Sequence, residues 1–413
     1  MKKETKKAPT IRFQGFTDDW EQRKFSELFK RRMERNNGQF DKTKWISVAN
    51  MYYQDPDKVT SNNIDTRTYV LRLGDISFEG HSNKEFKIGR FVENDIGDGV
   101  ISELFPIYRH ITSYDLNFWK HYINIENIMF PKLQRCIEVS YTSSNKLSEK
   151  FFLKESILVP AILEQKKIGT YLKKIDNLIT LHQRKLDQLK KLKKYFLQNM
   201  FPTKGEKVPR IRFKGFTGDW KQRKFGEIAE YKKGPFGSAL KKDFFIPDSA
   251  TSVKVYEQQN AINKNWNLSR YYISKEYAQK LKSFEVHAGD IIVSCAGTIG
   301  EIYELPAQSR SGIINQALMR IRVDEETVCK DIFKLAFSNM IDSFSREFSN
   351  GSAIKNIPPF ADLKPMKVLL PNKDEQKIIG DFFTDIDKTI TLHQRKLNQL
   401  QTMKKFMLQN LFI

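Results

Sequence analysis

Asp57, Glu85 and Lys87 are the residues whose types and spacing could most directly do chemistry. In the pattern Pro56-Asp57 followed by Glu85-Phe86-Lys87, two carboxylates could hold Mg²⁺ while the lysine assists an attacking water. The pattern is short enough to arise by chance, and the second half of the chain has no equivalent. We therefore interpret these residues as ordinary polar positions, and stand-alone nuclease activity remains the less favoured alternative.

A second stretch, Ile357-Pro358-Pro359-Phe360, is similar to the Asn/Asp-Pro-Pro-Tyr/Phe loop of amino-methyltransferases. The required amide or acid is displaced, because Asn356 precedes Ile357, and no glycine-rich strand-to-helix turn is present to hold S-adenosylmethionine. The phosphate-binding pattern Gly-x-x-x-x-Gly-Lys-Ser/Thr is also missing from the sequence. We expect no catalytic residue, no metal site and no cofactor on this chain.

The charge balance points to a polyanionic partner. Of 413 residues, 70 are Lys or Arg against 49 Asp or Glu, a formal net charge of +21. Such an excess favours nucleic acid first and an anionic membrane surface second. No apolar run reaches the ~20 residues that span a bilayer, and the first residues lack the apolar core of a signal peptide. Cys136, Cys295 and Cys329 are widely spaced and indicate neither disulfides nor zinc, so we expect a cytoplasmic protein.

The elements that would position any site are duplicated. Residues 11–27 reappear as residues 211–227 at an offset of 200, and residues 181–186 reappear letter for letter as residues 392–397 at an offset of 211. The order is therefore a short motif, a middle section and a helical segment, and then the same again. We predict mixed α/β (α+β) inserts joined by two long antiparallel coiled-coil helices, closed into a pseudo-two-fold ring that brings both ends of the chain together.

Each helical copy has apolar residues at alternating steps of four and three, which is typical of a coiled coil. Asn372 with Glu375 has the pattern of a capping box at the start of the second helix. Histidine and lysine interrupt both seams at matching places, and we interpret them as fixing register, with metal binding or catalysis by the two histidines as the alternative. The residues expected to pair the helices are Ile175, Ile179, His182, Leu186, Leu189, Ile386, Ile390, His393, Leu397 and Leu400.

The two middle sections share almost no sequence, although the frame around them is nearly identical. We infer that each insert reads something different. Strand-like runs are predicted at residues 44–48 and 68–73 in the first insert and at residues 290–294 and 317–323 in the second. The polar loops between such runs supply the expected contacts, with amides suited to bases and cations suited to phosphates. In the first insert these residues are Arg31, Arg32, Asn36, Asn37, Lys84, Arg90, Ser144 and Asn145; in the second they are Lys232, Lys233, Phe236, Ser238, Gln258, Gln259, Asn260, Arg310, Ser352 and Lys355.

The repeated Glu-Gln-Lys-x-Ile-Gly and Leu-His-Gln-Arg-Lys-Leu segments, each following a divergent insert, resemble the DNA-specificity subunit of bacterial type I restriction-modification enzymes. Gly289-Asp290-Ile291, Gly297-Thr298-Ile299-Gly300 and Gly351-Ser352-Ala353-Ile354-Lys355 extend the resemblance through the second insert. The first insert has Gly74-Asp75-Ile76-Ser77 but no obvious Gly-Ser-x-Ile-Lys loop.

The resemblance implies a division of labour. Each insert would be a target recognition domain for one half of a split, asymmetric site in double-stranded DNA. The helices would be conserved spacers, roughly 50 Å long at 1.5 Å per residue. Two methyltransferase subunits and two restriction and translocation subunits would assemble on this frame and bring S-adenosylmethionine, ATP and Mg²⁺.

The expected segments are 1–159 for the first recognition domain, 160–201 for the first spacer helix, 202–370 for a linker and the second domain, and 371–413 for the second spacer helix. The rival class is a coiled-coil adaptor or membrane-surface scaffold whose basic charge serves acidic partners. It predicts no sequence-dependent DNA binding.

Overall fold

The structure, a computed structural model, describes residues 7–61, 63–138, 144–203, 205–348 and 357–413. The chain forms two compact units. Unit 1 comprises residues 1–185 and 393–413, and unit 2 comprises residues 186–392. Each unit contains one insert and a part of both long helices, so the helices belong to the cores of both units.

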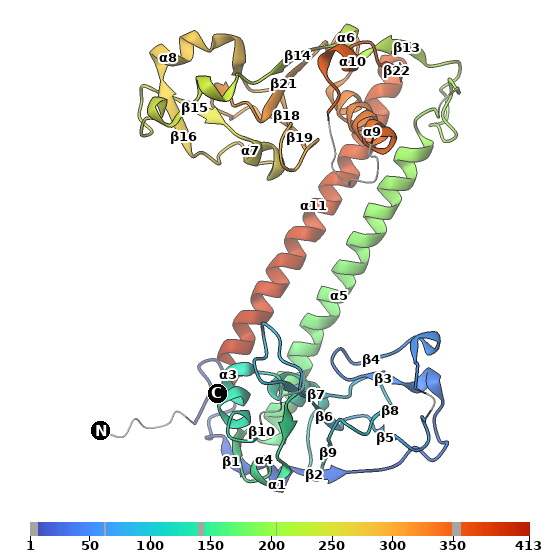
Figure 1. The fold of residues 1–413 in the computed structure, drawn as a ribbon, viewed down its shortest axis with the longest axis vertical. Helices are drawn as coiled ribbons and strands as arrows, with labels where there is room; N and C mark the ends of the chain where they lie inside the picture. The colour runs from blue at the N-terminus through green and yellow to red at the C-terminus, as the bar shows by residue number, and fades with distance from the viewer. Residues whose placement is uncertain (1–6, 62, 139–143, 204, 349–356) are drawn as a thin grey trace. The chain divides into compact units, whose positions relative to one another are not determined.

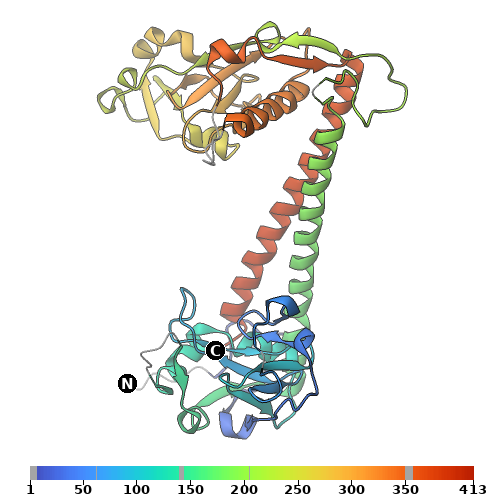
Figure 2. The same cartoon turned by 45° about the vertical axis from the view of Figure 1, so that its right-hand side comes forward.

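The two long helices are α5 (Ile162–Asn199) and α11 (Lys373–Asn410), of 38 residues each. They run side by side (Figures 1 and 2). They are antiparallel, because Ile168 near the start of α5 shares the unit 1 core with Leu411 just beyond the end of α11. In unit 2 the rings of Phe196 and Phe382 lie 5.0 Å apart. The predicted fold class, mixed α/β domains joined by two long helices, is confirmed.

The repeated short motifs fasten each insert to the start of a long helix. Arg12 donates to both carboxylate oxygens of Glu164 at 2.7 Å, and Arg212 binds Glu375 at 2.7 and 2.8 Å. Asn372 Oδ1 accepts the Glu375 N–H at 2.9 Å, as a helix cap does. The predicted capping box is only half right, because the Glu375 carboxylate binds Arg212.

The chain closes on itself within unit 1. The Ile11 N–H donates to the Asn410 carbonyl at 3.0 Å, and the Ile211 N–H donates to the Asn199 carbonyl at 2.9 Å in unit 2. In unit 2 a short linker in the sequence joins the two residues that form this hydrogen bond. In unit 1 the equivalent two residues come from opposite ends of the sequence. This is the closure that the predicted ring requires.

Unit 2 contains a four-stranded antiparallel sheet in the order β14 (Ala229–Lys233), β21 (Leu318–Val323), β18 (Ile291–Ser294) and β19 (Ile302–Glu304). Unit 1 contains the same arrangement, in the order β2 (Phe29–Arg32), β9 (Ile107–His110), β6 (Ile76–Glu79) and β7 (Arg90–Glu93). The labelled strands can be followed in Figure 1. The inserts are therefore built on one plan despite their different sequences.

One ion pair with a buried carboxylate and a partly exposed arginine repeats on these sheets. Arg109 donates to both oxygens of Asp75 at 2.7 and 2.8 Å, and Arg322 donates to both oxygens of Asp290 at 2.8 and 3.0 Å. Asp75 also accepts the N–H of residue 72 and Asp290 that of residue 287, at 2.9 and 3.0 Å. A bidentate charge-assisted pair orients both partners, so each pair holds the turn that enters β6 or β18.

A second layer of strands differs between the units. In unit 2 the order is β16 (Tyr271–Ser274), β15 (Ser252–Tyr256), β20 (Gly312–Ile314) and β17 (Glu285–Val286), with β15 and β20 parallel. In unit 1, β5 (Thr68–Leu71) pairs with β8 (Gly99–Ser102), and β3 (Ile46–Ser47) pairs with β4 (Tyr52–Tyr53). The four predicted strands thus exist, but the run at residues 44–48 shortens to two residues.

The remaining elements are β1 (Glu21–Lys24), α1 (Phe25–Leu28), α2 (Leu116–Tyr122), α3 (Glu126–Leu133), β10 (Ile137–Glu138), β11 (Lys146–Leu147), α4 (Glu149–Phe152), β12 (Ser156–Val159), β13 (Lys221–Lys224), α6 (Phe225–Ile228), α7 (Gln258–Ile262), α8 (Lys275–Lys280), α9 (Lys330–Phe348), α10 (Phe360–Leu363) and β22 (Lys367–Leu370).

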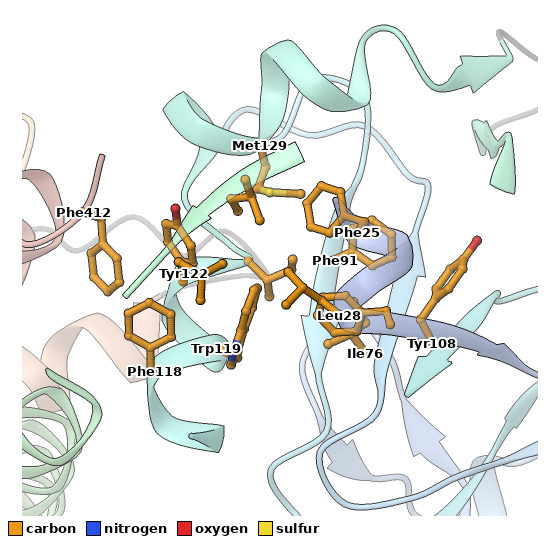
Figure 3. Packing of buried hydrophobic residues seen from close by; sticks show 14 of the residues in the cluster. Phe25, Leu28, Ile76, Phe91, Tyr108, Phe118, Trp119, Tyr122, Met129 and Phe412 are labelled. Atoms are coloured by element: carbon orange, nitrogen blue, oxygen red, sulfur yellow. The ribbon is translucent and has the colours of Figure 1, made fainter. Parts of the chain in front are cut away.

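The core of unit 1 is unusually aromatic. Phe412, beyond the end of α11, lies with its ring 5.2 Å from Tyr122 and 5.5 Å from Phe118 (Figure 3). Trp20, from the first short motif, packs edge-on to Tyr122 at 5.8 Å. Segments from both ends of the sequence therefore complete one hydrophobic core.

Candidate nucleic-acid interface

In unit 2, three connecting loops meet at one edge of the four-stranded sheet, where β14 ends and β21 begins. The Gly234 N–H donates to the Leu318 carbonyl at 2.9 Å, and the Cys295 N–H donates to the Ala317 carbonyl at 2.7 Å. A Cβ placed on Gly234 would lie 1.9 Å from the Asn315 carbonyl oxygen, so only glycine allows this approach. The sequence-predicted loop at residues 232–238 is therefore held against the 315–318 turn.

Most predicted residues of the second insert lie at this edge. Lys233, Phe236 and Ser238 are exposed, and 89% of the Phe236 side chain faces solvent. Lys232 is half-buried, with its ammonium 4.9 Å from the centre of the Phe284 ring. The edge thus combines cations, a hydroxyl and an aromatic ring on a firmly held backbone.

Gln258 and Gln259 open α7 beside the loop that follows β18. Gln258 lies next to Gly297, and its buried Oε1 has no hydrogen-bond partner among the described residues. Gln259 is exposed and accepts a hydrogen bond from Asn263 at 2.8 Å. The two amides therefore lie near the same edge, and Gln258 retains unused accepting capacity.

Asn260 is placed differently from its neighbours. It is 2% exposed, donates to the carbonyls of Asn265 and Leu268 at 3.0 and 2.6 Å, and accepts the Glu257 N–H at 2.8 Å. Its amide holds the loop after α7 and is not available to a base, so the expected contact at Asn260 is not supported.

Three other predicted residues lie away from the edge or outside the described chain. Arg310 precedes β20 and binds Asp248 at 3.4 Å, at the end of β20 opposite to the 315–318 turn. It is thus separated from the loops that meet at the edge. Ser352 and Lys355 lie outside the described residues.

In unit 1 the equivalent edge is formed by the end of β2, the loop from β6 to β7 and the start of β9. Arg32 is paired with Ile107 at this edge, and Arg90 opens β7 opposite Glu79. Lys84 is exposed in the loop from β6 to β7. The structure therefore brings three predicted cations of the first insert to one edge.

Ser144 and Asn145 lie against the same loop. The Asn145 N–H donates to the Gly80 carbonyl at 3.0 Å, its Nδ2 donates to Ser82 at 3.3 Å, and Ser144 forms a bridge with His81. This places both residues at the edge, although their sequence position is distant from it. The Asn145 side chain can form more hydrogen bonds than the one to Ser82.

The remaining predicted residues of the first insert have structural partners or separate positions. Arg31 stacks over the Tyr108 ring at 5.4 Å. Asn36 is 1% exposed and bonds Phe40 through both its oxygen and its nitrogen, so its amide is not available to a base. Asn37 is exposed in a turn with a positive φ of 46°.

Two residues at the unit 1 edge were missed by sequence reasoning. Met33 follows β2 and is 64% exposed, and Leu104, in the turn before β9, is 80% exposed. Apolar residues carry no charge or hydrogen-bonding signal, so a search for polar loops passes over them. Their exposure at the end of a basic strand is the signal that would have found them.

The long helices present a second repeated set of contacts. Nδ1 of His182 lies 2.9 Å from Nδ1 of His393, and both side chains are half-buried. Ile175, Leu186, Ile386, Leu397 and Leu400 are buried, and Ile179, Leu189 and Ile390 are half-buried. All ten residues predicted to pair the helices thus lie on inward-facing or partly covered positions.

The part of the chain that the structure describes meets neither the requirements of a metal site nor those of a membrane-spanning helix. Within them, no group of three or more His, Cys, Asp or Glu side chains could hold a metal ion. Asp57 lies in a short 3-10 turn, where its N–H donates to Asp55, and Glu85 is exposed. None of the helices in the described ranges combines the length and the apolar character needed to cross a bilayer.

Comparison with known proteins identifies the class. Residues 217–402 match the family model of the type I restriction modification DNA specificity domain. This part of the chain, which includes the unit 2 edge, is therefore similar to such a domain.

Relatives and solved structures extend the comparison to the whole chain. It is 25% identical to a putative type I restriction enzyme MjaX specificity subunit of Methanocaldococcus jannaschii over 83% of this chain and 78% of the relative. It is 24% identical to the MjaVIII specificity subunit of the same organism, over 63% of this chain and 61% of the relative. The fold is shared with a type I restriction-modification S subunit from M. genitalium, with a TM-score of 0.60, 12% identity and coverage of 98% and 99% of the two chains. The family model and the two relatives indicate a specificity subunit of a type I restriction-modification system, and the solved structure shows that the fold is shared.

Proposed function

We propose that each insert reads one half of a split, asymmetric DNA site, and that the long helices set the distance between the halves. The observation that carries this proposal is the repeated sheet edge. Both units have the same strand order and the same Asp–Arg pair, but different side chains leave the edge in the two units. A common scaffold with different loops is what two readers of different half-sites need.

The chemistry of the edges suits this role. Arg32, Lys84 and Lys233 would contact phosphates, which gives affinity and a steep dependence on salt. Gln258 and Gln259 would contact base edges in the second half-site, since an amide can bind adenine through two hydrogen bonds. Ser144 and Asn145 would do the same in the first half-site.

The long helices would act as the spacer. A helix of 38 residues is about 57 Å long, or between one and two turns of DNA, and linked readers on one face of a duplex are spaced by about one turn or a multiple of it. The interhelical contacts described above would keep the helices in one register. The length of the unread spacer would then follow from helix length.

The chain would be a non-catalytic subunit that works in the cytoplasm with two methyltransferase subunits and two restriction and translocation subunits. S-adenosylmethionine, ATP and Mg²⁺ would bind to those partners. Support comes from large apolar residues that are exposed on both long helices at matching repeat positions. These pairs are Leu181 with Leu392, Leu192 with Met403, and Tyr195 with Phe406. Because this exposed apolar surface occurs once on each long helix, it suits the binding of two equivalent partner subunits.

Sequencing of methylated adenine in cells with and without the gene tests the proposal. We expect one bipartite motif that is present only with the gene. Binding to a duplex with that motif, in the presence of the modification subunits, should exceed binding to a random duplex at every salt concentration. If the protein binds both duplexes equally, or if every methylated motif persists after the gene is deleted, an adaptor or scaffold is favoured instead.

A further inference from the structure

Two large apolar side chains are the most exposed of their kind in the described chain, and both lie at the equivalent edge of their sheet. Phe236 in unit 2 is 89% exposed and Leu104 in unit 1 is 80% exposed. Phe236 leaves the end of β14, and Leu104 precedes the start of β9. The strand partners β21 and β2 complete the same edge in each unit. A single exposed apolar residue needs no explanation, but one at the equivalent edge of each of two unlike inserts does, although the two residues lie in different connections.

The backbone on both sides of Phe236 is held firmly. Gly234 is fixed to the 315–318 turn, and the Ala239 N–H donates to the Phe236 carbonyl at 2.9 Å. Pro235 is buried, and its ring fixes its own φ, which limits the freedom of the loop that carries Phe236. The ring is therefore presented to solvent by a rigid loop, so that little conformational entropy is lost when a partner covers it.

Leu104 is held in a comparable way. The turn is closed by the Phe105 N–H, which donates to the Ser102 carbonyl at 3.1 Å, and by the Glu103 N–H, which donates to the Arg67 carbonyl at 3.0 Å. The Glu103 side chain also binds Arg35 at 2.5 Å and Arg67 at 3.2 Å. Met33, 64% exposed, lies on the neighbouring end of β2.

The charged residues near Phe236 and Leu104 indicate which kind of partner would cover these two side chains. Lys233, Lys241 and Lys242 are exposed in the connection that carries Phe236. Arg67, with 67% of its side chain exposed, is in the network beside Leu104. Cations around an apolar tip suit a polyanion with an apolar interior, and stacked DNA bases surrounded by phosphates have that composition.

We propose that Phe236 and Leu104 are wedges that enter the base stack of their half-sites and distort the duplex there. The inference rests on the proposed function and adds to it how each half-site is deformed. Apolar side chains between base steps partly unstack them and kink the duplex, and an unstacked base is easier to move out of the helix. Each wedge would thus add indirect readout, because the cost of the kink depends on the base step.

The test uses the full chain with the modification subunits and a duplex that carries the methylated motif, with 2-aminopurine placed in turn at each half-site. Wild type should raise 2-aminopurine fluorescence at both half-sites. Phe236→Ala should abolish the rise at the second half-site only and weaken binding by about tenfold or more. Leu104→Ala should abolish it at the first half-site only. Phe236→Trp should keep the rise.

Two contrasting variants separate the wedge from other effects. Lys233→Ala should lower the slope of affinity against salt by about one while fluorescence still rises, whereas Phe236→Ala should leave that slope unchanged. Leu163→Ala removes an apolar side chain of 69% exposure on α5 and should change neither quantity.

The outcomes distinguish this inference from the proposed function. If wild type prefers the motif over random duplex but Phe236→Ala and Leu104→Ala bind and distort it as wild type does, the wedge is overturned and the proposed function stands. If Phe236→Ala instead reduces assembly with the modification subunits, the residue binds protein and the wedge is likewise overturned. If wild type shows no preference for the motif, the proposed function itself fails.

Discussion

Lys193 of α5 binds Asp387 of α11 in unit 2, with Nζ 2.6 and 2.8 Å from the two carboxylate oxygens. The repeat of this pair, Lys404 with Asp176, is found in unit 1 at 2.6 Å. There His121 adds a contact at 3.0 Å, and although burial opposes ionisation, the hydrogen bonds from His121 and Lys404 lower the pKa of Asp176 to about 2. The lysines that interrupt both seams therefore link the two helices.

Reversal of one charge in this pair should weaken helix pairing, and reversal of both should restore it. Lys193→Asp places two carboxylates face to face, whereas Lys193→Asp with Asp387→Lys exchanges the partners. Because both groups are partly exposed, we expect a loss of about 1 kcal/mol for the single change. Urea unfolding of the wild type, both single variants and the double variant gives the coupling energy. Additive effects would show that the pair contributes nothing to register.

Glu93→Gln should stabilise unit 1 at neutral and alkaline pH. Both Glu93 oxygens are buried without a hydrogen-bond partner among the described residues, and burial, then Asp95 and Asp115, raises the pKa of this carboxyl well above its usual range. Because the pKa of Glu93 is raised in the folded chain, the contribution of its protonated form to folding stability is fully present below the pKa that Glu93 has in the unfolded chain. This contribution is lost as the pH rises through the pKa of Glu93 in the folded chain. The unfolding midpoint of Glu93→Gln should exceed that of wild type at pH 8 and match it near pH 4. Glu85→Gln, at an exposed position, should change neither midpoint.

Phe412→Ala should destabilise the chain more than Phe201→Ala, its repeat counterpart. Phe412 is 6% exposed inside the aromatic core of unit 1, and its removal should cost about 3–5 kcal/mol. Phe201 is only half-buried against Trp220, with ring centres 5.8 Å apart, so its loss should cost less. Amide hydrogen exchange, measured separately for unit 1 and unit 2, would show which unit unfolds more readily in each variant. Equal losses would indicate that the end of the chain is not an integral part of the unit 1 core.

The repeats and the seam predicted the architecture well, because heptad spacing and duplicated motifs are local signals. The run at residues 44–48 was overestimated, because Asp41 caps a 3-10 turn over Lys42–Lys44 and leaves only two residues in the strand. The common plan of the inserts escaped notice, since Asp75 and Asp290 each follow a glycine, but their partners Arg109 and Arg322 lie more than 30 residues away. Such pairings depend on strand order, which the sequence does not display.

The contact residues were harder to predict for a related reason. Gln258, Gln259 and Asn260 look alike in sequence, but the turn of α7 places Gln259 outside and Asn260 inside. Hydrogen-bonding capacity alone does not tell a loop that binds a ligand from one that binds itself.

One heptad added to each long helix, at the level where His182 faces His393, should lengthen the unread spacer by about three base pairs. Seven residues add about 10.5 Å of helix, and one base pair rises about 3.4 Å. Both half-sites should stay the same. Sequencing of methylated adenine reports spacer and half-sites together, and a changed half-site with an unchanged spacer would contradict the spacer role of the helices. The same insertion in one helix alone should disrupt the register and reduce stability.

The most direct test of two independent readers on one frame is the methylated motif of a chain whose residues 25–159 are replaced by the corresponding insert of another specificity subunit. The account predicts that one half-site changes, while the other half-site and the spacer length stay as they were. A motif in which both halves change together, or in which neither does, would contradict it.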